Sequence, residues 1–188
     1  MEEVLKTLPM EKFPEGIDIC FYNRHLYRSI FIYSIIKFQQ HFKAQDTDLI
    51  LATFPKSGTT WLKVLAFTIA NCNNYPVNES PLLITNPHSL IYFLEFDIYG
   101  KNSILKLEDL PSPRVFATHM SHSALPTSIK DSNCRVVYLC QNPLDVFISY
   151  RHFVAKLSNT PFDPSLIDES LTCSVMVCPH MGHSGIIC

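Results

Sequence analysis

Residues 48–63, DLILATFPKSGTTWLK, decide the fold of this chain. The short apolar run at residues 49–54 is typical of a buried strand, and the polar residues 55–60 predict a tight loop after it. A helix is predicted from Trp61 on, with an apolar face made of Trp61, Val64, Leu65, Thr68 and Ile69. A strand, a loop and a helix N-terminus in this order form a geometry that binds phosphate, because the free N–H groups of the first turn and the helix dipole favour an anion.

The loop contains the residue types that phosphate binding requires. Gly58 lets the backbone approach a ligand closely, and Lys56 adds a positive charge on a flexible stem. Ser57, Thr59 and Thr60 add hydroxyl donors. The order differs from the GxxxxGK[ST] loop, since the lysine precedes the single glycine. On residue types alone, a loop that only caps a helix remains open as the alternative.

The string TFPKSGTTWLK at residues 53–63 resembles the 5′-phosphosulfate loop of the cytosolic sulfotransferases, and its residues are most similar to those of the plant branch of that family. The donor in that family is 3′-phosphoadenosine 5′-phosphosulfate (PAPS). The resemblance implies that the 5′ end of this donor is held by Lys56, Ser57, Gly58, Thr59, Thr60 and Trp61. It also implies that Trp61 stacks near the adenine and that Lys56 neutralises charge on the leaving nucleotide, with no metal ion required.

A second strand is predicted at residues 114–119, RVFATH, which end on His119. Ligands of open α/β sheets bind beyond the carboxyl ends of the strands, so a parallel arrangement would bring His119 to the same edge as Lys56. A histidine there suits a general base, and a solvated strand-end histidine is the simpler alternative. The match of PSPRVFATH to the family's strand implies that His119 is the catalytic base that takes the proton of the acceptor hydroxyl.

A third strand is predicted at residues 134–140, CRVVYLC, followed by a helix with Asn142 as its N-cap and Pro143 as its first residue. The string YLCQNPLDVFIS resembles the family's 3′-phosphate segment, which implies that Ser149 contacts the 3′-phosphate of the donor. Gln141 stands where that segment has an arginine. Loss of a charge-assisted contact to phosphate costs about 1.5–3 kcal/mol, or about one to two decades in donor affinity.

The remaining stretches carry weaker patterns. Residues 1–20 predict a polar lead-in, and residues 21–45 predict a helix. The apolar side of this helix is expected to contain Phe31, Ile35, Ile36 and Phe38. Its aromatic residues could line an acceptor pocket, although core packing is the expectation. Residues 89–96 predict a further helical run near the acceptor pocket that the resemblance implies, and His88 before it is interpreted as an ordinary turn histidine.

The composition is that of a globular domain. The chain has 188 residues, 47% hydrophobic and 17% charged, which suffices for one domain with a core. A net charge of −2 provides no basic field for nucleic acid. The acidic N-terminus does not suit a signal peptide, and the apolar run at residues 30–36 is too short to cross a bilayer. We therefore expect a cytoplasmic protein with no nucleic-acid and no membrane partner, whose seven cysteines are free thiols.

The last 18 residues, LTCSVMVCPHMGHSGIIC, do not resemble the family. We expect residues 1–170 to be an incomplete sulfotransferase domain, the N-terminal portion of that fold, and residues 171–188 to be an aberrant tail. The tail has zinc-type ligands whose spacing matches no compact zinc pattern: Cys173, Cys178, His180, His183 and Cys188. The preferred hypothesis is a frameshift or aberrant splicing, because codons can be chosen for the tail that spell the family-like string DMFCHGVSPHGPFWDHM one base away.

The sequence thus predicts an α/β fold with a parallel central sheet, a P-loop-like phosphate-binding loop and flanking helices. The predicted function is transfer of a sulfonyl group from PAPS to a hydroxyl of a small-molecule acceptor, such as a flavonoid, a steroid or a hormone-like compound. Two alternatives remain open: a catalytically inactive nucleotide-binding remnant of that family, and a nucleotide kinase or NTPase. The missing Walker order and the lack of a clear Mg²⁺-binding aspartate after an apolar strand argue against the second.

Overall fold

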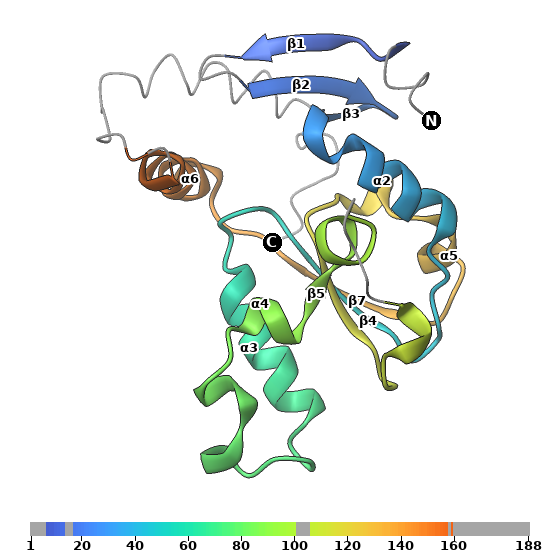
Figure 1. Cartoon of the computed structure of the whole chain (residues 1–188), viewed down its shortest axis with the longest axis vertical. Helices are drawn as coiled ribbons and strands as arrows, with labels where there is room; N and C mark the ends of the chain where they lie inside the picture. The colour runs from blue at the N-terminus through green and yellow to red at the C-terminus, as the bar shows by residue number, and fades with distance from the viewer. Residues whose placement is uncertain (1–6, 14–16, 101–105, 158, 160–188) are drawn as a thin grey trace.

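The central unit of the described residues is a four-stranded parallel sheet with helices on both faces (Figure 1). The computed structural model of the chain describes residues 7–13, 17–100, 106–157 and 159. The strand order is β5-β6-β4-β7, and all three pairings are parallel. The strands are β4 (Leu49–Thr53), β5 (Tyr92–Phe93), β6 (Val115–Thr118) and β7 (Arg135–Leu139). The predicted α/β class with a parallel central sheet is therefore confirmed.

The helices around the sheet differ widely in length. The long ones are α2 (Ser29–His41), α3 (Thr59–Ala70) and α6 (Pro143–Leu157). Shorter turns are α4 (Pro87–Leu90), α5 (Thr127–Lys130), the π-helical turn η4 (Leu94–Ile98) and the 3₁₀ turns Val77–Glu79, Pro81–Leu83, Leu107–Asp109 and His122–Ala124. Within the described ranges, none of these helices has the length and apolar content to span a bilayer.

Each face of the sheet packs against a different set of helices. On one face, Ile50 and Phe116 belong to a buried cluster that includes residues of α2 and α5. On the other face, Leu51 and Ala117 pack with Ala66 of α3. Figure 1 shows α2 and α5 on one side of the sheet and α3 and α4 on the other. Strands that are covered on both faces read as continuous apolar runs, which is why β4 and β6 were recognisable in the sequence.

The N-terminal region differs from the prediction. A separate antiparallel sheet replaces part of the expected lead-in and the first part of the expected helix, and its strands are β1 (Met10–Phe13), β2 (Ile17–Tyr22) and β3 (His25–Arg28). The helix predicted for residues 21–45 begins only at Ser29. A two-residue turn causes the difference, because Asn23 and Arg24 both have positive φ, as the tight turns of β-hairpins require. The predicted burial within α2 is confirmed for Ile35, Ile36 and Phe38.

Residues 89–96 do not form the single helical run that was predicted. Helix α4 ends at Leu90, strand β5 follows, and η4 starts at Leu94. The side chain of Asp97 stabilises the break, because its Oδ2 accepts a hydrogen bond of 2.7 Å from the backbone N–H of Phe93. The break matters for the site, since it places Phe93 and Glu95 next to the end of β6.

Helix α3 is present as predicted, but a different face is buried. Its buried residues are Thr59, Lys63 and Ala66. The residues expected to face the core are largely exposed: Trp61 is 80% exposed, Leu65 56% and Ile69 63%. The predicted apolar face was therefore wrong. The loop decides the orientation, because Thr59 Oγ1 is hydrogen-bonded to Thr53 Oγ1 at 2.7 Å and Lys63 follows on the same side four residues later.

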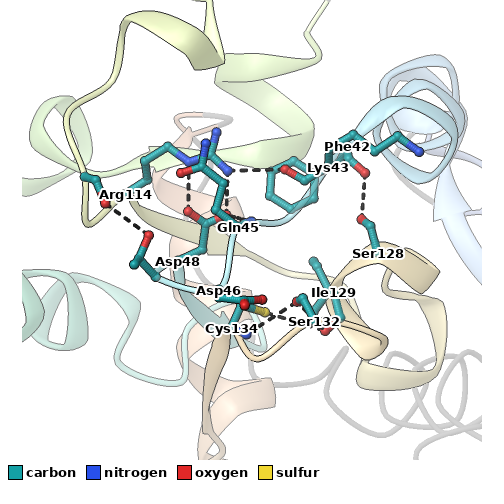
Figure 2. Close-up of polar contacts among 12 residues, drawn as sticks. Phe42, Lys43, Gln45, Asp46, Asp48, Arg114, Ser128, Ile129, Ser132 and Cys134 are labelled. Carbon is teal, nitrogen blue, oxygen red and sulfur yellow. Dashed lines mark hydrogen bonds and ion pairs between the residues drawn. The ribbon is translucent and has the colours of Figure 1, made fainter.

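A buried ion pair joins the beginnings of β4 and β6. Arg114 donates to both carboxylate oxygens of Asp48, at 2.8 and 2.6 Å, and both side chains are buried. Arg114 also donates to the Lys43 carbonyl, and Asp48 accepts from the Gln45 backbone N–H (Figure 2). These contacts hold the two strands side by side at their amino ends, so that their carboxyl ends meet at the opposite edge of the sheet.

Candidate functional site

The loop after β4 is a tight turn with left-handed backbone at two positions. The Ser57 N–H donates to the Phe54 carbonyl at 3.1 Å, and φ is 68° at Lys56 and 101° at Gly58. Gly58 also lies close to β7, because a Cβ at this position would come within 3.3 Å of Leu139 Cδ2. Glycine meets both demands at position 58 without strain.

Among the described residues, no protein acceptor is found for the donors at the N-terminus of α3. Its first turn contains no acidic residue, and Gly58 at the N-cap provides no side-chain hydrogen bond. The hydroxyl of Ser57 is buried and has no hydrogen-bond partner among the described residues. An oxyanion completes such an arrangement at the positive end of a helix dipole. The loop thus has the shape and the donors of an anion site, while the ligand contacts of its individual residues stay predictions.

His119 lies at the carboxyl end of β6, beside this loop. Strands β4 and β6 run parallel, as the expected common edge required, with Ala52 opposite Thr118. The Nδ1 atom of His119 lies 2.8 Å from the Thr53 carbonyl oxygen and 3.4 Å from Thr53 Oγ1. The Thr53 hydroxyl is in turn bonded to Thr59, so a short chain of hydrogen bonds connects His119 with the first residue of α3.

The hydrogen bond to Thr53 fixes the tautomer of His119. A carbonyl oxygen only accepts, so Nδ1 carries the hydrogen and Nε2 keeps its lone pair. Burial lowers the pKa of His119 to about 4, and the charge of Lys63 acts in the same direction, against the opposing hydrogen bond to Thr53. The ring is therefore neutral at pH 7, with Nε2 ready to accept a proton.

One residue of β5 and one residue of η4 hold His119 in place. The backbone N–H of His119 donates to Glu95 Oε1 at 2.6 Å, and the His119 ring packs on Phe93 with 4.6 Å between the ring centroids. Burial raises the pKa of Glu95 to about 7, although hydrogen bonds from His119 and Thr118 oppose this shift. The second carboxylate oxygen of Glu95 is buried and, in the part of the chain that the structure describes, has no partner.

A further polar cluster surrounds Phe93. Lys63 Nζ lies 2.8 Å from the Ile91 carbonyl oxygen, 3.1 Å from His88 Nδ1 and 3.6 Å from the centroid of the Phe93 ring. The other ring nitrogen of His88, Nε2, lies 3.2 Å from Thr60 Oγ1. His88 is therefore a member of a hydrogen-bond network that reaches the loop, and its interpretation as an ordinary turn histidine was wrong.

Helix α6 approaches the loop from the side of β7. Lys56 Nζ lies 4.7 Å from the ring centroid of Phe153 on this helix. Ser149 is half-buried one turn earlier, on the same helix face, since residues four apart are neighbours. Asn142 caps α6 as predicted, because its Oδ1 accepts a backbone hydrogen bond of 2.9 Å from the first turn. Gln141 is exposed between β7 and α6.

The structure tests neither the predicted role of Trp61 nor the predictions about the tail. Trp61 is 80% exposed on the first turn of α3, and its stacking on an adenine stays a prediction. The tail, with the expected domain boundary at residue 170 and the potential ligands at residues 173–188, lies outside the described residues. Across the residues that are described, no group of three or more histidine, cysteine and acidic side chains is suited to a metal ion.

The sequence reasoning missed the residues that surround His119 and the loop: Lys63, His88, Phe93 and Glu95. Lys63 had a signal, because a lysine four positions after Thr59 lies on the side of the helix where the loop hydroxyl is buried. Glu95 had one too, as the single acid in the apolar stretch LIYFLEF. His88 and Phe93 had none, since their roles depend on the break between α4 and η4.

The comparisons with known proteins agree with this geometry. Residues 46–181 match the family model described as a sulfotransferase domain. Cytosolic sulfotransferase 12 of Arabidopsis thaliana is 43% identical over 158 residues, which are 82% of this chain and 48% of that protein. Cytosolic sulfotransferase 14 of the same plant is 39% identical over 174 residues, which are 90% of this chain and 50% of that protein.

A solved structure shows the same fold. The crystal structure of an Arabidopsis thaliana sulphotransferase aligns with a TM-score of 0.75 at 42% identity, and the alignment covers 82% of this chain and 55% of that one. The chain thus spans about half the length of the curated relatives it matches.

Proposed function

The chain belongs to the sulfotransferase domain family, and from this premise we propose that it binds PAPS at the loop after β4 and transfers the sulfonyl group to a hydroxyl of a small molecule. In the proposed reaction the acceptor oxygen attacks sulfur, and the bond between sulfur and the bridging oxygen of the donor breaks. The proton of the acceptor passes to His119, and the electron pair stays on the 5′-phosphate of the released 3′-phosphoadenosine 5′-phosphate (PAP).

One observation carries this proposal. The Nδ1–H of His119 is bound to the Thr53 carbonyl at 2.8 Å, at the sheet edge where the phosphate loop begins. This contact leaves the Nε2 lone pair for the proton of the acceptor and holds the ring in one orientation. The low pKa of about 4 keeps that lone pair available throughout the neutral range.

The donor contacts follow from the loop. We propose that the backbone and side chains of residues 56–60 hold the 5′-phosphosulfate, with Trp61 near the adenine and Ser149 near the 3′-phosphate. The buried hydroxyl of Ser57 supports this assignment, since it has no acceptor among the described residues. Lys56 is exposed on its flexible stem, so its ammonium can leave the Phe153 ring and neutralise charge on the bridging oxygen.

The acceptor and the compartment are proposed from the relatives. Their names describe them as cytosolic sulfotransferases, and we propose the same compartment for this chain. The acceptor would be a small hydroxylated compound of the flavonoid, steroid or hormone-like class. The ring cluster of Phe93, Phe96 and His119 supports an apolar acceptor, because aromatic side chains line most small-molecule sites.

Two assays on the 188-residue chain test the proposal. Calorimetric titration with PAP measures donor binding, and radiolabelled PAPS with a panel of phenols, steroids and hydroxylated hormones measures transfer. We expect His119→Asn to bind PAP as before and to lose transfer, whereas Lys56→Ala loses both. Sulfonyl transfer that survives in His119→Asn would show that His119 is not the catalytic base. Absence of PAP binding at millimolar PAP would overturn the proposed donor site.

A second candidate is a remnant that binds nucleotide without catalysis, and Gln141 is the observation that favours it. The exposed amide of Gln141 cannot supply the charge that an arginine brings to a phosphate. Gln141→Arg should tighten PAP binding about 10- to 100-fold, whereas Gln40→Arg on the exposed side of α2 should not. If the tight-binding variant still transfers nothing to any acceptor, the remnant is the correct description.

A further inference from the structure

Lys63 is a positive charge at a place where electrostatics disfavours one. Its side chain is fully buried in the N-terminal half of α3, where the helix dipole favours negative charge. Its hydrogen-bond and ring contacts within the described residues are with neutral groups: the Ile91 carbonyl, His88 Nδ1 and the face of Phe93. Burial lowers the pKa of Lys63 to about 8, although the charges of nearby acids oppose the shift. An anion bound at the loop would balance this charge.

The hydrogen bonds from Lys63 run in one direction. An ammonium group only donates, so Nδ1 of His88 must accept. Burial and the charge of Lys63 lower the pKa of His88, which keeps the ring neutral. Because Nδ1 of this neutral ring accepts from Lys63, its single hydrogen is on Nε2. That hydrogen is donated to Thr60 Oγ1, 3.2 Å away. The hydroxyl of Thr60 then directs its own hydrogen to another acceptor.

Thr60 is well placed to use that hydrogen on a ligand. It is exposed on the first turn of α3, in the loop where the buried hydroxyl of Ser57 also lacks an acceptor among the described residues. We propose that Lys63, acting through His88, turns the hydroxyl of Thr60 toward the 5′-phosphosulfate of the donor. This inference rests on the proposed function and adds two positioning residues to the donor site. We call the hydrogen bonds from Lys63 to His88 and from His88 to Thr60 the relay. The buried charge of Lys63 also polarises the relay, which strengthens each of its hydrogen bonds.

A purely structural role is the competing explanation. Lys63 also ties α3 to the segment between α4 and β5 through the Ile91 carbonyl, and such a tie would affect donor binding only through packing. The two explanations differ in what they predict for the His88 tautomer and for the coupling between Lys63 and Thr60.

The tautomer is tested without any donor. Long-range nitrogen–proton NMR spectra of the chain, with the His88 signals assigned from His88→Gln, should show the neutral Nε2–H form at pH 7. Lys63→Met is nearly isosteric, removes the buried charge and leaves Nδ1 without a donor, so the tautomer should shift toward a mixture. An Nδ1–H or a charged ring in the unmodified chain would overturn the proposed direction of the relay.

The coupling is tested with PAP. We expect Lys63→Met and Thr60→Val each to weaken PAP binding about 10-fold. The double variant should weaken it far less than the 100-fold product, because both changes break the same series of hydrogen bonds. Additive losses would overturn the relay in favour of packing. The exposed Lys130→Met, with the same change in net charge, should bind PAP normally. If the unmodified chain does not bind PAP, the proposed function and the role of Thr60 toward it fail together, while the NMR spectra still decide the direction of the hydrogen bonds.

Discussion

At the scale of single residues, the protonation state of His119 is the first property to test. Its pKa is lowered from 6.5 to about 4 mainly by burial, so the neutral ring stabilises the fold above pH 6.5 and this contribution is lost as the pH falls toward 4. NMR spectra recorded from pH 8 to 4 should show the Nδ1–H tautomer until the pH approaches 4. The signals are assigned from His119→Asn. Titration near pH 6.5, or an Nε2–H form, would contradict the hydrogen bond to Thr53.

Ser57, which is proposed to bind the donor, is expected to weaken the ligand-free fold. Its buried hydroxyl has no acceptor among the described residues, and a buried unsatisfied polar group costs about 1–3 kcal/mol. Ser57→Ala should therefore raise the melting temperature of the ligand-free chain while PAP binding weakens. Calorimetry and thermal unfolding measure the two effects.

A matched change elsewhere serves as the control for Ser57→Ala. The hydroxyl of Ser132 donates to the Ile129 carbonyl at 3.1 Å, so Ser132→Ala should lower the melting temperature and leave PAP binding unchanged. A fall in melting temperature for both variants would show that the Ser57 hydroxyl is already satisfied without a ligand.

At the scale of elements, the ion pair between Asp48 and Arg114 sets how β4 and β6 lie together. Asp48→Asn removes one charge of a buried pair and leaves Arg114 uncompensated, which costs about 3–5 kcal/mol in such cases. We expect a loss of that size in urea unfolding. Replacing both partners, as Asp48→Leu with Arg114→Met, should recover much of it, because an apolar pair avoids the desolvation penalty.

The neighbouring Asp46 provides the control for the ion pair. It lies at the surface and accepts hydrogen bonds only from the backbone and side chain of Asn133 in the described structure. Asp46→Asn should therefore lose much less stability than Asp48→Asn in the same urea titration. Equal losses in the free energy of unfolding would mean that the buried ion pair stabilises the strands no more than the surface contact of Asp46 does.

The elements that could be predicted from sequence are those whose pattern is local. The apolar run of β4, the glycine at position 58 and the Asn142-Pro143 start of α6 each specify their own structure, and the first two define the anion site. The stretch at residues 17–28 could not be assigned in this way. Its aromatic residues suit a helix or a strand, and the two-residue turn together with packing of Cys20 against α2 decides for the hairpin.

The residues of the candidate site differ in the same way: some could be predicted from a local sequence pattern and others could not. His119 was predictable because the end of a strand is a local feature and its neighbours in the sheet follow from parallel pairing. The relay of Lys63, His88 and Thr60 was not, because it depends on α4 folding back onto α3, a contact between segments 25 residues or more apart in the sequence. Which face of α3 is buried was decided by the hydrogen bond between Thr59 and Thr53, which the apolar spacing of the helix does not reveal.

At the scale of the whole molecule, the sheet has one edge that carries exposed apolar side chains. Strand β7 pairs only with β4 among the described strands. Val136 and Tyr138 point to one face and Val137 to the other, and they are 37%, 52% and 41% exposed. An outer strand with open backbone groups and apolar residues on both faces is a template for pairing with another chain.

We therefore expect the 188-residue chain to self-associate as its concentration rises, and Val137→Lys to shift it toward the monomer. A lysine places a charge on the strand edge that a second copy would have to bury, at a position already 41% exposed, so the fold itself should be retained. Sedimentation velocity over a range of concentrations measures the effect. Ile84→Lys removes an even more exposed apolar residue, 93% exposed, from a position outside every strand, and it should change nothing. A chain that stays monomeric at high concentration would show that β7 is not a pairing edge.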